Sequence, residues 1–489
     1  MIRFLKSITI QESIYLISIS ILFILLRLPS VIEPHWYGDE GIYSVIAHAL
    51  RDGSVLYRDI WDNKPPFLYL IYTIFNGDLF FIKSFSIMIG IASIISVYIL
   101  SKKLIHSSKG AMVSTACFAL LFGLPMLEGN IANAENFMLL PTAMAYILLL
   151  SDITNVRRMF FSGLLLSCAV LIKVVAVFDT AALCVVMVLI LQRRNDEGLQ
   201  NTLRQLMRSA SLKAFLTGLV ILPILVSSYF LIVGAFPQFL KSTFATNVGY
   251  VGFENHFIFP QGLLSLKVLL LVSGLYFLYK SRKKLSQSGL ILSVWMIFAL
   301  FSVYFSARPY THYILMGLIP FSLLVGYSSA NFNKRIGYAL FTLVVGSLIY
   351  THFPLYLKNI RYYENYIHYV SGAKNFREYT AFFDRNAVYD YELASFINSR
   401  LPKNSKLFFW SDSGHLYTLT NTLPPGRYIV SYHLESYPHA MRETIEVLQK
   451  KPVDYIISTR PANTIPREML RGYSLIYTIN RTQIYEKSE

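Results

Sequence analysis

Two carboxylates and a lysine lie just beyond the first long apolar run of the chain. The stretch "WYGDEGIYSVIAHAL" (36–50) carries Asp39 and Glu40 side by side, and "WDNKPPFLYL" (61–70) puts Lys64 directly before two prolines. Carboxylates serve in proton transfer, and an ammonium group stabilises developing negative charge. The residue before a proline is restricted to an extended backbone, so this spacing fixes the direction of the Lys64 side chain.

Structural roles remain open for the same residues. The apolar side chains of residues 42–50 share one face of a short helix, which suits a position on a membrane surface. Asp39 then lies at or near the N-cap, where it accepts backbone N–H bonds and stays ionised. Lys64 begins a second short helix, which ends near Phe75, and a lysine there can extend to lipid headgroups.

A further polar segment, "EGNIANAENFMLLP" (128–141), contains two glutamates and three asparagines but no cation. Loop solvation and helix capping explain asparagines in such a segment. Glu135 stands where the next apolar run begins, which makes it the stronger candidate for a functional carboxylate. Asn136 follows it and is a candidate for binding a substrate.

The segment "SARPYTHYILMGLIP" (306–320) contributes Arg308, Tyr310 and His312. A guanidinium group suits bidentate binding of phosphate, which favours Arg308 as an anion-binding residue. A histidine at the start of a helix is more often structural than catalytic. The long connection 236–262, with Lys241, Glu254 and His256, is expected to act as a mobile lid.

The composition places these residues in an integral membrane protein. Of 489 residues, 54% are hydrophobic and only 15% are charged. Apolar runs of up to about 20 residues recur, enough to cross a hydrocarbon layer as helices. Their alternating connections predict about eleven spans before residue 355, with the first run kept as an anchor. No disulfide framework or zinc site is indicated, because the three cysteines all lie within apolar runs.

The distribution of charge predicts the orientation of the spans. The net charge is +16, and the basic residues gather in alternate connections, around Lys102, Arg157, Arg193 and Lys283. The positive-inside rule makes these connections cytoplasmic. The segments that carry the candidate residues then lie on the outer face.

The stretch 159–191 has arginine pairs on both sides and must cross the membrane twice with only about 16 residues for each pass. The tip of this hairpin is therefore expected below the membrane surface. Lys173 and Asp179 lie near the tip, and charges at that depth need a wet cavity or a partner.

Hydropathy falls after about residue 355, which predicts a transmembrane domain over 1–355 and an extracytoplasmic α/β domain over 356–489. Helices are expected at "LASFINSRL" and "HAMRETIEVLQKK". Strands are expected at "KLFFWS", "RYIVSY" and "VDYIIS", with a closing hairpin at "YSLIYTINRTQIYE".

In this setting the motifs resemble the GT-C glycosyltransferases, in particular the dolichyl-phosphate-mannose protein mannosyltransferase-like and lipid A aminoarabinose transferase branches. The resemblance lies in "GDEGIY", "WDNKPP", "NAENF", "LIKVV" and "ARPYTHYIL", in this order. It covers about the first 330 residues and extends weakly to the outer C-terminal domain. It implies a polytopic helical fold with outer-face juxtamembrane helices and transfer of a sugar from a polyprenyl-phosphate donor, with inversion.

The resemblance also implies roles for the candidate residues. Asp39 would act as the base towards an acceptor hydroxyl, while Glu135 assists or orients the acceptor and Glu40 sets the local charge or binds the sugar. Where the acceptor is itself a phosphate, Asp39 would position groups instead. The cations expected at the donor phosphate are Lys64, Arg308 and Lys173, and the residues expected to bind substrate are Tyr43, Asn136, His312 and Tyr310.

One departure from the aminoarabinose transferase pattern concerns a metal. Asn63 stands where that family has a metal-associated glutamate, so no metal ligand is assigned and a divalent ion is not indicated. The expected partners are a polyprenyl-phosphate sugar, a lipid, protein or glycan acceptor, and membrane lipids, without nucleic acid. The alternatives are a transporter or lipid flippase, and an outer-face polysaccharide ligase or polymerase.

Overall fold

A computed structural model describes residues 9–195, 198–246, 264–306, 310–330, 332–437, 439–479 and 481–488. Its contacts divide the chain into two compact units. The first, here called the helical unit, contains residues 1–30, 83–229 and 245–359. The second, the mixed unit, contains residues 31–82, 230–244 and 360–489. The domain boundary near residue 355 stays a prediction, since two segments from the N-terminal half group with the C-terminal residues.

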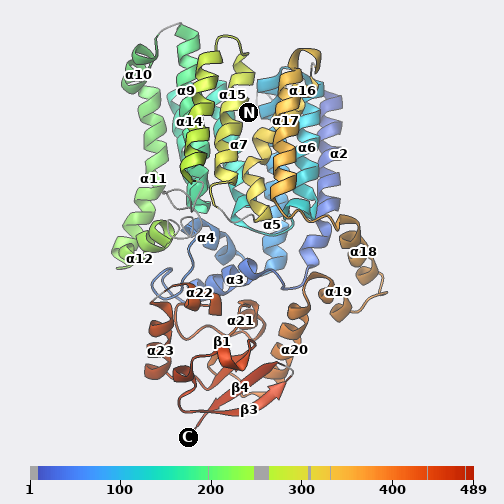
Figure 1. The fold of residues 1–489 in the computed structure, drawn as a ribbon, viewed down its shortest axis with the longest axis vertical. Helices are drawn as coiled ribbons and strands as arrows, with labels where there is room; N and C mark the ends of the chain where they lie inside the picture. The colour runs from blue at the N-terminus through green and yellow to red at the C-terminus, as the bar shows by residue number, and fades with distance from the viewer. Residues whose placement is uncertain are drawn as a thin grey trace. The chain divides into compact units, whose positions relative to one another are not determined.

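The helical unit consists of long helices that lie side by side (Figure 1). They are α2 (Ile10–Arg27), α5 (Leu79–Ile105), α6 (Ser108–Gly123), α7 (Ala134–Ser151), α8 (Val156–Ile172), α9 (Val177–Asn195), α10 (Leu199–Arg208), α11 (Ala210–Ile232), α14 (Leu264–Ser281), α15 (Gln287–Val303), α16 (Leu318–Ser329) and α17 (Phe332–His352). Short 3-10 turns link them: η1 (Leu28–Ile32), η2 (Pro125–Leu127), η3 (Val174–Ala176) and η5 (Thr311–Gly317).

The hydropathy of these helices identifies a multi-pass membrane protein. Among the described residues, 7 helices are long and apolar enough to cross a membrane, and α6 and α15 are shorter apolar helices. The expected number of about eleven spans stays a prediction, since α8 and α17 are not among these apolar helices. The first apolar run forms α2, whose start is fixed by a capping box between Thr9 and Glu12.

The stretch 159–191 forms the expected pair of helices joined by a short turn, and the depth of that turn in a membrane stays a prediction. α8 ends at Ile172 and α9 begins at Val177, so Lys173 lies in the turn and Asp179 in the first turn of α9. The partner that Asp179 was expected to need is Trp295 of α15, whose indole Nε1–H donates to Oδ1 at 2.8 Å. The Trp295 ring also stacks on Tyr146 at 3.6 Å between centroids, so this carboxylate is held within the helical unit.

Glycines let two helix pairs of this unit approach closely. A Cβ on Gly163 of α8 would lie 2.1 Å from the Phe215 carbonyl oxygen of α11, and one on Gly218 would lie 2.0 Å from the Phe160 carbonyl oxygen. A third glycine, Gly326 of α16, faces α6 in the same way. Small residues at such crossings allow backbone contact, which is a main source of helix association in membranes.

The mixed unit combines short helices with a sheet. Its first helices are α3 (Gly38–Arg51), α4 (Pro66–Ile74), α12 (Phe236–Leu240) and the π-helical turn η4 (Lys241–Ala245). The rest are α18 (Asn359–Val370), α19 (Phe376–Phe383), α20 (Arg385–Arg400), α21 (His415–Leu419), α22 (Ser431–Ser436), α23 (Ala440–Lys450), η6 (Ala462–Thr464) and η7 (Arg467–Leu470). The strands are β1 (Leu407–Trp410), β2 (Tyr455–Ser458), β3 (Tyr473–Ile479) and β4 (Thr482–Lys487).

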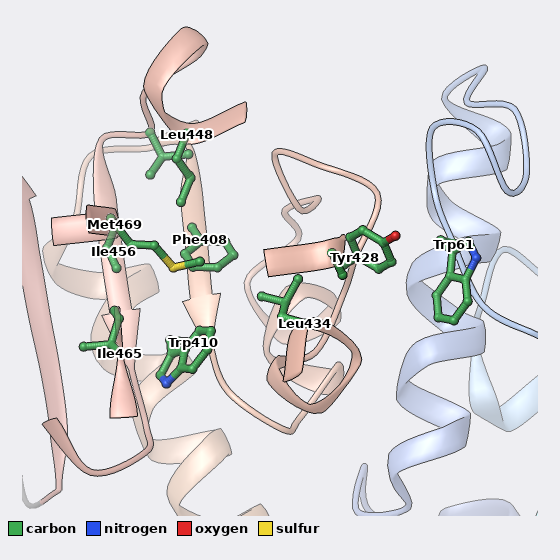
Figure 2. Packing of buried hydrophobic residues seen from close by; sticks show 11 residues of the cluster. Trp61, Phe408, Trp410, Tyr428, Leu434, Leu448, Ile456, Ile465 and Met469 are labelled. Atoms are coloured by element: carbon green, nitrogen blue, oxygen red, sulfur yellow. The ribbon is translucent and has the colours of Figure 1, made fainter. Parts of the chain in front are cut away.

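The sheet has the order β1-β2-β4-β3. β1 and β2 are parallel, with Leu407 opposite Tyr455, whereas β4 is antiparallel to both β2 and β3. Phe408, Trp410 and Ile456 are almost wholly buried and pack with side chains from α22, α23 and η7 (Figure 2). The expected α/β character, both helices, the closing hairpin and two of the three single strands are confirmed.

The strand expected at "RYIVSY" (427–432) is wrong. Tyr428, Ile429 and Val430 are buried, but none of them belongs to the described sheet, and α22 begins at Ser431. The backbone at the start of this segment bonds outside the sheet, since the Arg427 carbonyl accepts a hydrogen bond from the backbone N–H of Trp61 at 2.8 Å. A short apolar run cannot by itself distinguish a strand from a buried extended segment.

The apolar face of α3 packs against other parts of the protein, since Ile42, Val45, Ile46 and Ala49 are each at most 2% exposed. The position of this helix on a membrane surface stays a prediction. Within the mixed unit this helix packs on α4 and α21. The second short helix has the expected length, with Pro66 in its first turn and its end just before Phe75.

Substitution of Gly218 tests the close crossing of α8 and α11. The variant Gly218→Leu should lower the melting temperature of the detergent-purified protein markedly, because its side chain collides with backbone that cannot move aside. Gly337→Leu in α17 is the matched control, since nothing lies within 4 Å of a Cβ at that position. Equal melting temperatures for the two variants would contradict the proposed packing.

Candidate functional site

Two buried tyrosines fix the backbone of Lys64. Tyr57 donates from its hydroxyl to the Lys64 carbonyl at 2.7 Å, and the Lys64 N–H donates to the hydroxyl of Tyr69 at 3.1 Å. Both tyrosines are 0% exposed. Pro65 then caps α4, with Pro66 as its first residue. The lysine is therefore held at both of its peptide groups before its side chain makes any contact.

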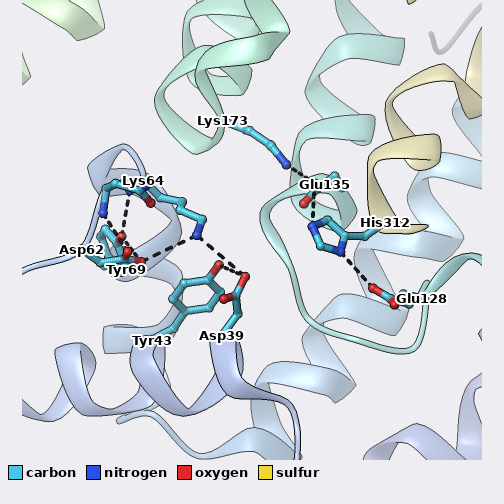
Figure 3. A network of polar contacts seen from close by, with 10 residues as sticks. Asp39, Tyr43, Asp62, Lys64, Tyr69, Glu128, Glu135, Lys173 and His312 are labelled. Atoms are coloured by element: carbon cyan, nitrogen blue, oxygen red, sulfur yellow. Dashed lines mark hydrogen bonds and ion pairs between the residues drawn. The ribbon is translucent and has the colours of Figure 1, made fainter. Parts of the chain in front are cut away.

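The ammonium group of Lys64 lies between two carboxylates (Figure 3). Its Nζ is 3.7 Å from Oδ2 of Asp39 and 4.0 Å from Oδ2 of Asp62. It also lies 5.6 Å from the centre of the Tyr43 ring. The side chains of Lys64 and Asp39 remain 26% and 29% exposed, so both can reach a substrate.

Two tyrosine hydroxyls orient the carboxylates. Tyr43, one helical turn after Asp39, donates to its Oδ2 at 3.0 Å, and Tyr69 donates to Oδ2 of Asp62 at 2.8 Å. Burial raises the pKa of both tyrosines well above the usual value, and the nearby aspartates raise it further. The two phenols consequently remain protonated donors over any ordinary pH range. Asp39 lies in the first turn of α3, where the helix dipole favours its negative charge.

The cap of α3 differs in detail from the expectation. The N-cap residue is Tyr37, which makes no side-chain capping bond, and Asp39 is the second residue of the helix. Glu40 is 0% exposed, whereas Asp39 is partly open. Of these two acidic residues, Asp39 is the one that is partly exposed and lies beside the Lys64 ammonium group. The role of Glu40 stays a prediction.

The start of α3 is held by α21, through contacts that sequence reasoning missed. His415 Nε2 lies 2.9 Å from the Tyr37 carbonyl oxygen, and its Nδ1 lies 3.2 Å from Nδ1 of His35. Gly41 allows this approach, since a Cβ there would lie 2.9 Å from the His415 backbone nitrogen. The glycine in "DEG" is the signal that could have suggested a close neighbour, although nothing in the sequence names His415.

A second polar cluster belongs to the helical unit and surrounds Glu135 (Figure 3). Glu135 is 1% exposed, in the first turn of α7, and forms an ion pair with Lys173 from the α8–α9 turn. His312 faces two carboxylates, with Nε2 at 3.7 Å from Glu135 and Nδ1 at 2.9 Å from Glu128. The Lys173 ammonium lies 4.5 Å from the centre of the Tyr313 ring. The structure thus joins three predicted residues from three separate segments.

Other predicted residues have structural contacts or lie outside the description. The Asn136 amide donates to the carbonyls of Gly129 and Ile131 at 2.7 and 2.6 Å, which shapes the loop before α7. Tyr310 is 43% exposed and stacks on His312. The described residues do not include Arg308. They also do not include most of the expected lid, with Glu254 and His256.

The residues beside Lys64 do not form a recognisable metal site. Asn63 supplies a neutral amide where the aminoarabinose transferase pattern has a glutamate. Among the residues that the structure describes, no group of three or more His, Cys, Asp or Glu side chains is arranged to hold a metal ion.

Comparison with known proteins establishes the fold class. No family model matches the chain, and no curated protein matches it. The solved structures include similar folds, and they identify the chain as a polytopic membrane protein of the GT-C fold, as the sequence motifs predicted.

One similar structure is that of ArnT from Cupriavidus metallidurans bound to undecaprenyl phosphate. The TM-score is 0.57 at 13% identity, covering 96% of this chain and 97% of that chain. The archaeal oligosaccharyltransferase AglB from Archaeoglobus fulgidus, in complex with an inhibitory peptide and a dolichol-phosphate, gives a TM-score of 0.48 at 11% identity, covering 98% of this chain and 75% of that chain.

The ion pair of Glu135 and Lys173 can be tested for a structural role separately from a functional one. Lys173→Met should lower the melting temperature, since it leaves a buried carboxylate without its cation, at a cost of roughly 3–5 kcal/mol. The double variant Lys173→Met/Glu135→Gln should recover most of the stability, because both charges are removed together.

Thermal unfolding of these two variants and of Glu135→Gln alone measures the interaction energy between Lys173 and Glu135. A Lys173→Met variant as stable as the wild-type protein would contradict a stabilising role for the ion pair of Lys173 and Glu135. The activity of the double variant then reports whether the charges also serve the reaction.

Proposed function

We propose that the protein is an integral membrane glycosyltransferase that transfers a sugar from a polyprenyl-phosphate donor to an acceptor. The observation that carries this proposal is the pairing of partly exposed Asp39 and Lys64 at 3.7 Å, on a chain with the GT-C fold. ArnT, the lipid A aminoarabinose transferase of similar fold, is bound to undecaprenyl phosphate in its crystal structure. This supports a lipid-phosphate donor and disfavours the transporter or flippase alternative.

The proposed reaction uses the two charges differently. The acceptor hydroxyl attacks the anomeric carbon and gives its proton to Asp39, while the bond from that carbon to the phosphate oxygen breaks. The electron pair leaves with the polyprenyl phosphate, whose charge Lys64 stabilises. Attack from the face opposite the leaving group inverts the anomeric centre. Tyr43 holds the Asp39 carboxylate in place through its hydroxyl bond.

The cluster around Glu135 has a different electrostatic character. The charge of Lys173 is largely balanced by Glu135, and His312 lies between two carboxylates. We therefore propose Lys64 rather than Lys173 as the principal cation for the donor phosphate. Glu135 keeps its proposed role in orienting an acceptor, and Lys173 and Arg308 remain proposed secondary phosphate contacts.

We also propose that the reaction takes place on the outer face of the cytoplasmic membrane. In the helical unit, basic residues collect at one set of helix ends, such as Lys102 and Lys103 of α5 and Arg193 and Arg194 of α9. By the positive-inside rule these ends are cytoplasmic. Glu135 and Lys173 lie at the opposite helix ends, at the start of α7 and the end of α8.

The base assignment is tested by Asp39→Asn, which keeps the shape of the side chain but removes its basicity. In a strain that lacks the gene, expression of the wild-type protein should restore the envelope glycan that the deletion removes. With Asp39→Asn, the rate of transfer should fall by about 10²–10⁴. Asp52→Asn, at the exposed far end of the same helix, is the control and should restore the glycan fully. Full transfer by the Asp39→Asn protein would refute the base assignment.

The phosphate assignment is tested by binding of undecaprenyl phosphate to purified protein in nanodiscs. Lys64→Met should weaken binding roughly ten- to hundredfold, the loss expected for one charge-assisted contact. Lys403→Met, at an exposed position in the mixed unit, is the charge-matched control. Unchanged affinity in the Lys64→Met protein would remove Lys64 from the proposed donor site, whereas Asp39→Asn should bind the lipid as the wild-type protein does.

A further inference from the structure

His433 of α22 is a buried histidine beside the turn that carries Asp62 and Lys64. It is 6% exposed, and its ring meets the Trp61 ring edge-on at 5.1 Å between centroids. Trp61 directly precedes Asp62 and belongs to the buried cluster drawn in Figure 2 with Tyr428 and Leu434. Because the Trp61 N–H also donates to the Arg427 carbonyl, the segment that leads into α22 is fixed against this turn.

The side chain of His433 has an unsatisfied nitrogen. Its Nδ1 is buried and has no hydrogen-bond partner among the described residues. Trp61 cannot supply one, since its indole Nε1–H donates to the hydroxyl of Ser242 at 2.8 Å. Buried polar side-chain atoms normally have a partner in the folded protein or in a bound molecule. A substrate group that fits beside Lys64 would provide one.

The charges around His433 define the kind of group that it can bind. The pKa of His433 is lowered to about 4, chiefly by burial; among the charged neighbours, Asp62 and Asp39 raise it and Lys64 lowers it. The ring is consequently neutral near pH 7. A neutral imidazole has no charge with which to attract phosphate, but it donates one hydrogen bond and accepts another. That capacity matches a hydroxyl group.

These observations and the proposed function together identify the hydroxyl. If Lys64 binds the donor phosphate, the sugar bonded directly to that phosphate must lie within a few ångströms of the lysine. We propose that Nδ1 of His433 binds a hydroxyl group of the donor sugar, so that the C-terminal part of the chain contributes to sugar recognition. This inference rests on the proposed function and extends it to a residue outside the motifs of the first 330 residues.

Two substitutions separate hydrogen bonding from packing. His433→Phe keeps an aromatic ring against Trp61 but removes both ring nitrogens. His433→Asn loses the ring but keeps a hydrogen-bonding group near the position of Nδ1. A residue that serves only to pack on Trp61 tolerates the first change better, whereas a residue that binds a hydroxyl tolerates the second better.

The measurement compares undecaprenyl phosphate with undecaprenyl-phosphate conjugates of mannose, glucose and arabinose, each bound to full-length protein in nanodiscs. The dissociation constant of undecaprenyl phosphate divided by that of a conjugate gives the contribution of the sugar to binding. Any loss of folded protein affects both constants equally, because both come from one preparation. For the sugar that the wild-type protein binds most tightly, His433→Phe should reduce this ratio about three- to tenfold. His433→Asn should keep the ratio within about twofold.

The outcomes distinguish the inference from the proposed function. If His433→Phe keeps the wild-type ratio, or if no conjugate binds the wild-type protein more tightly than undecaprenyl phosphate does, the inference is overturned. If the wild-type protein fails to bind undecaprenyl phosphate and every conjugate, the proposed function fails, and the inference fails with it. If both variants reduce the ratio of dissociation constants to a similar extent, His433 has a packing role, and the inference is also overturned.

Discussion

The arrangement of this protein depends on the cost of placing charge near lipid. A charged side chain in or beside a membrane-spanning helix is tolerated only with a partner or with access to water. The structure meets this requirement in both polar clusters. Glu135 is paired with Lys173, and the buried carboxylate of Asp179 accepts a hydrogen bond from Trp295. Lys64 lies between two aspartates.

The same requirement separates charges that hold the structure from charges that are available for chemistry. Glu135 and Lys173 are mostly buried and balance each other, which suits a fixed arrangement. Asp39 and Lys64 are each more than a quarter exposed, at a separation that leaves room for other partners. A proton acceptor and a phosphate-binding cation need this kind of access, because each must exchange its present neighbour for a substrate group.

The precision of the Lys64 position comes from uncharged groups. Hydroxyls of Tyr57 and Tyr69 engage both of its peptide groups, and the following prolines fix the start of α4. Tyr69 also holds Asp62, so one phenol fixes the lysine backbone and orients one of the two carboxylates beside it. Side chains that are locked by buried neighbours lose little entropy when a substrate binds, which is the physical advantage of such a preorganised site.

The sequence by itself determined the membrane class, the approximate spans, the short α8–α9 hairpin and the polar segments. These features follow from local quantities: apolar run length, the period of hydrophobicity, and the restriction that proline imposes on Lys64. Only the tertiary structure decided that His415 holds the start of α3 and that "RYIVSY" forms no strand. Those outcomes depend on contacts between segments up to several hundred residues apart, and no local pattern encodes which distant side chain will fill a given space.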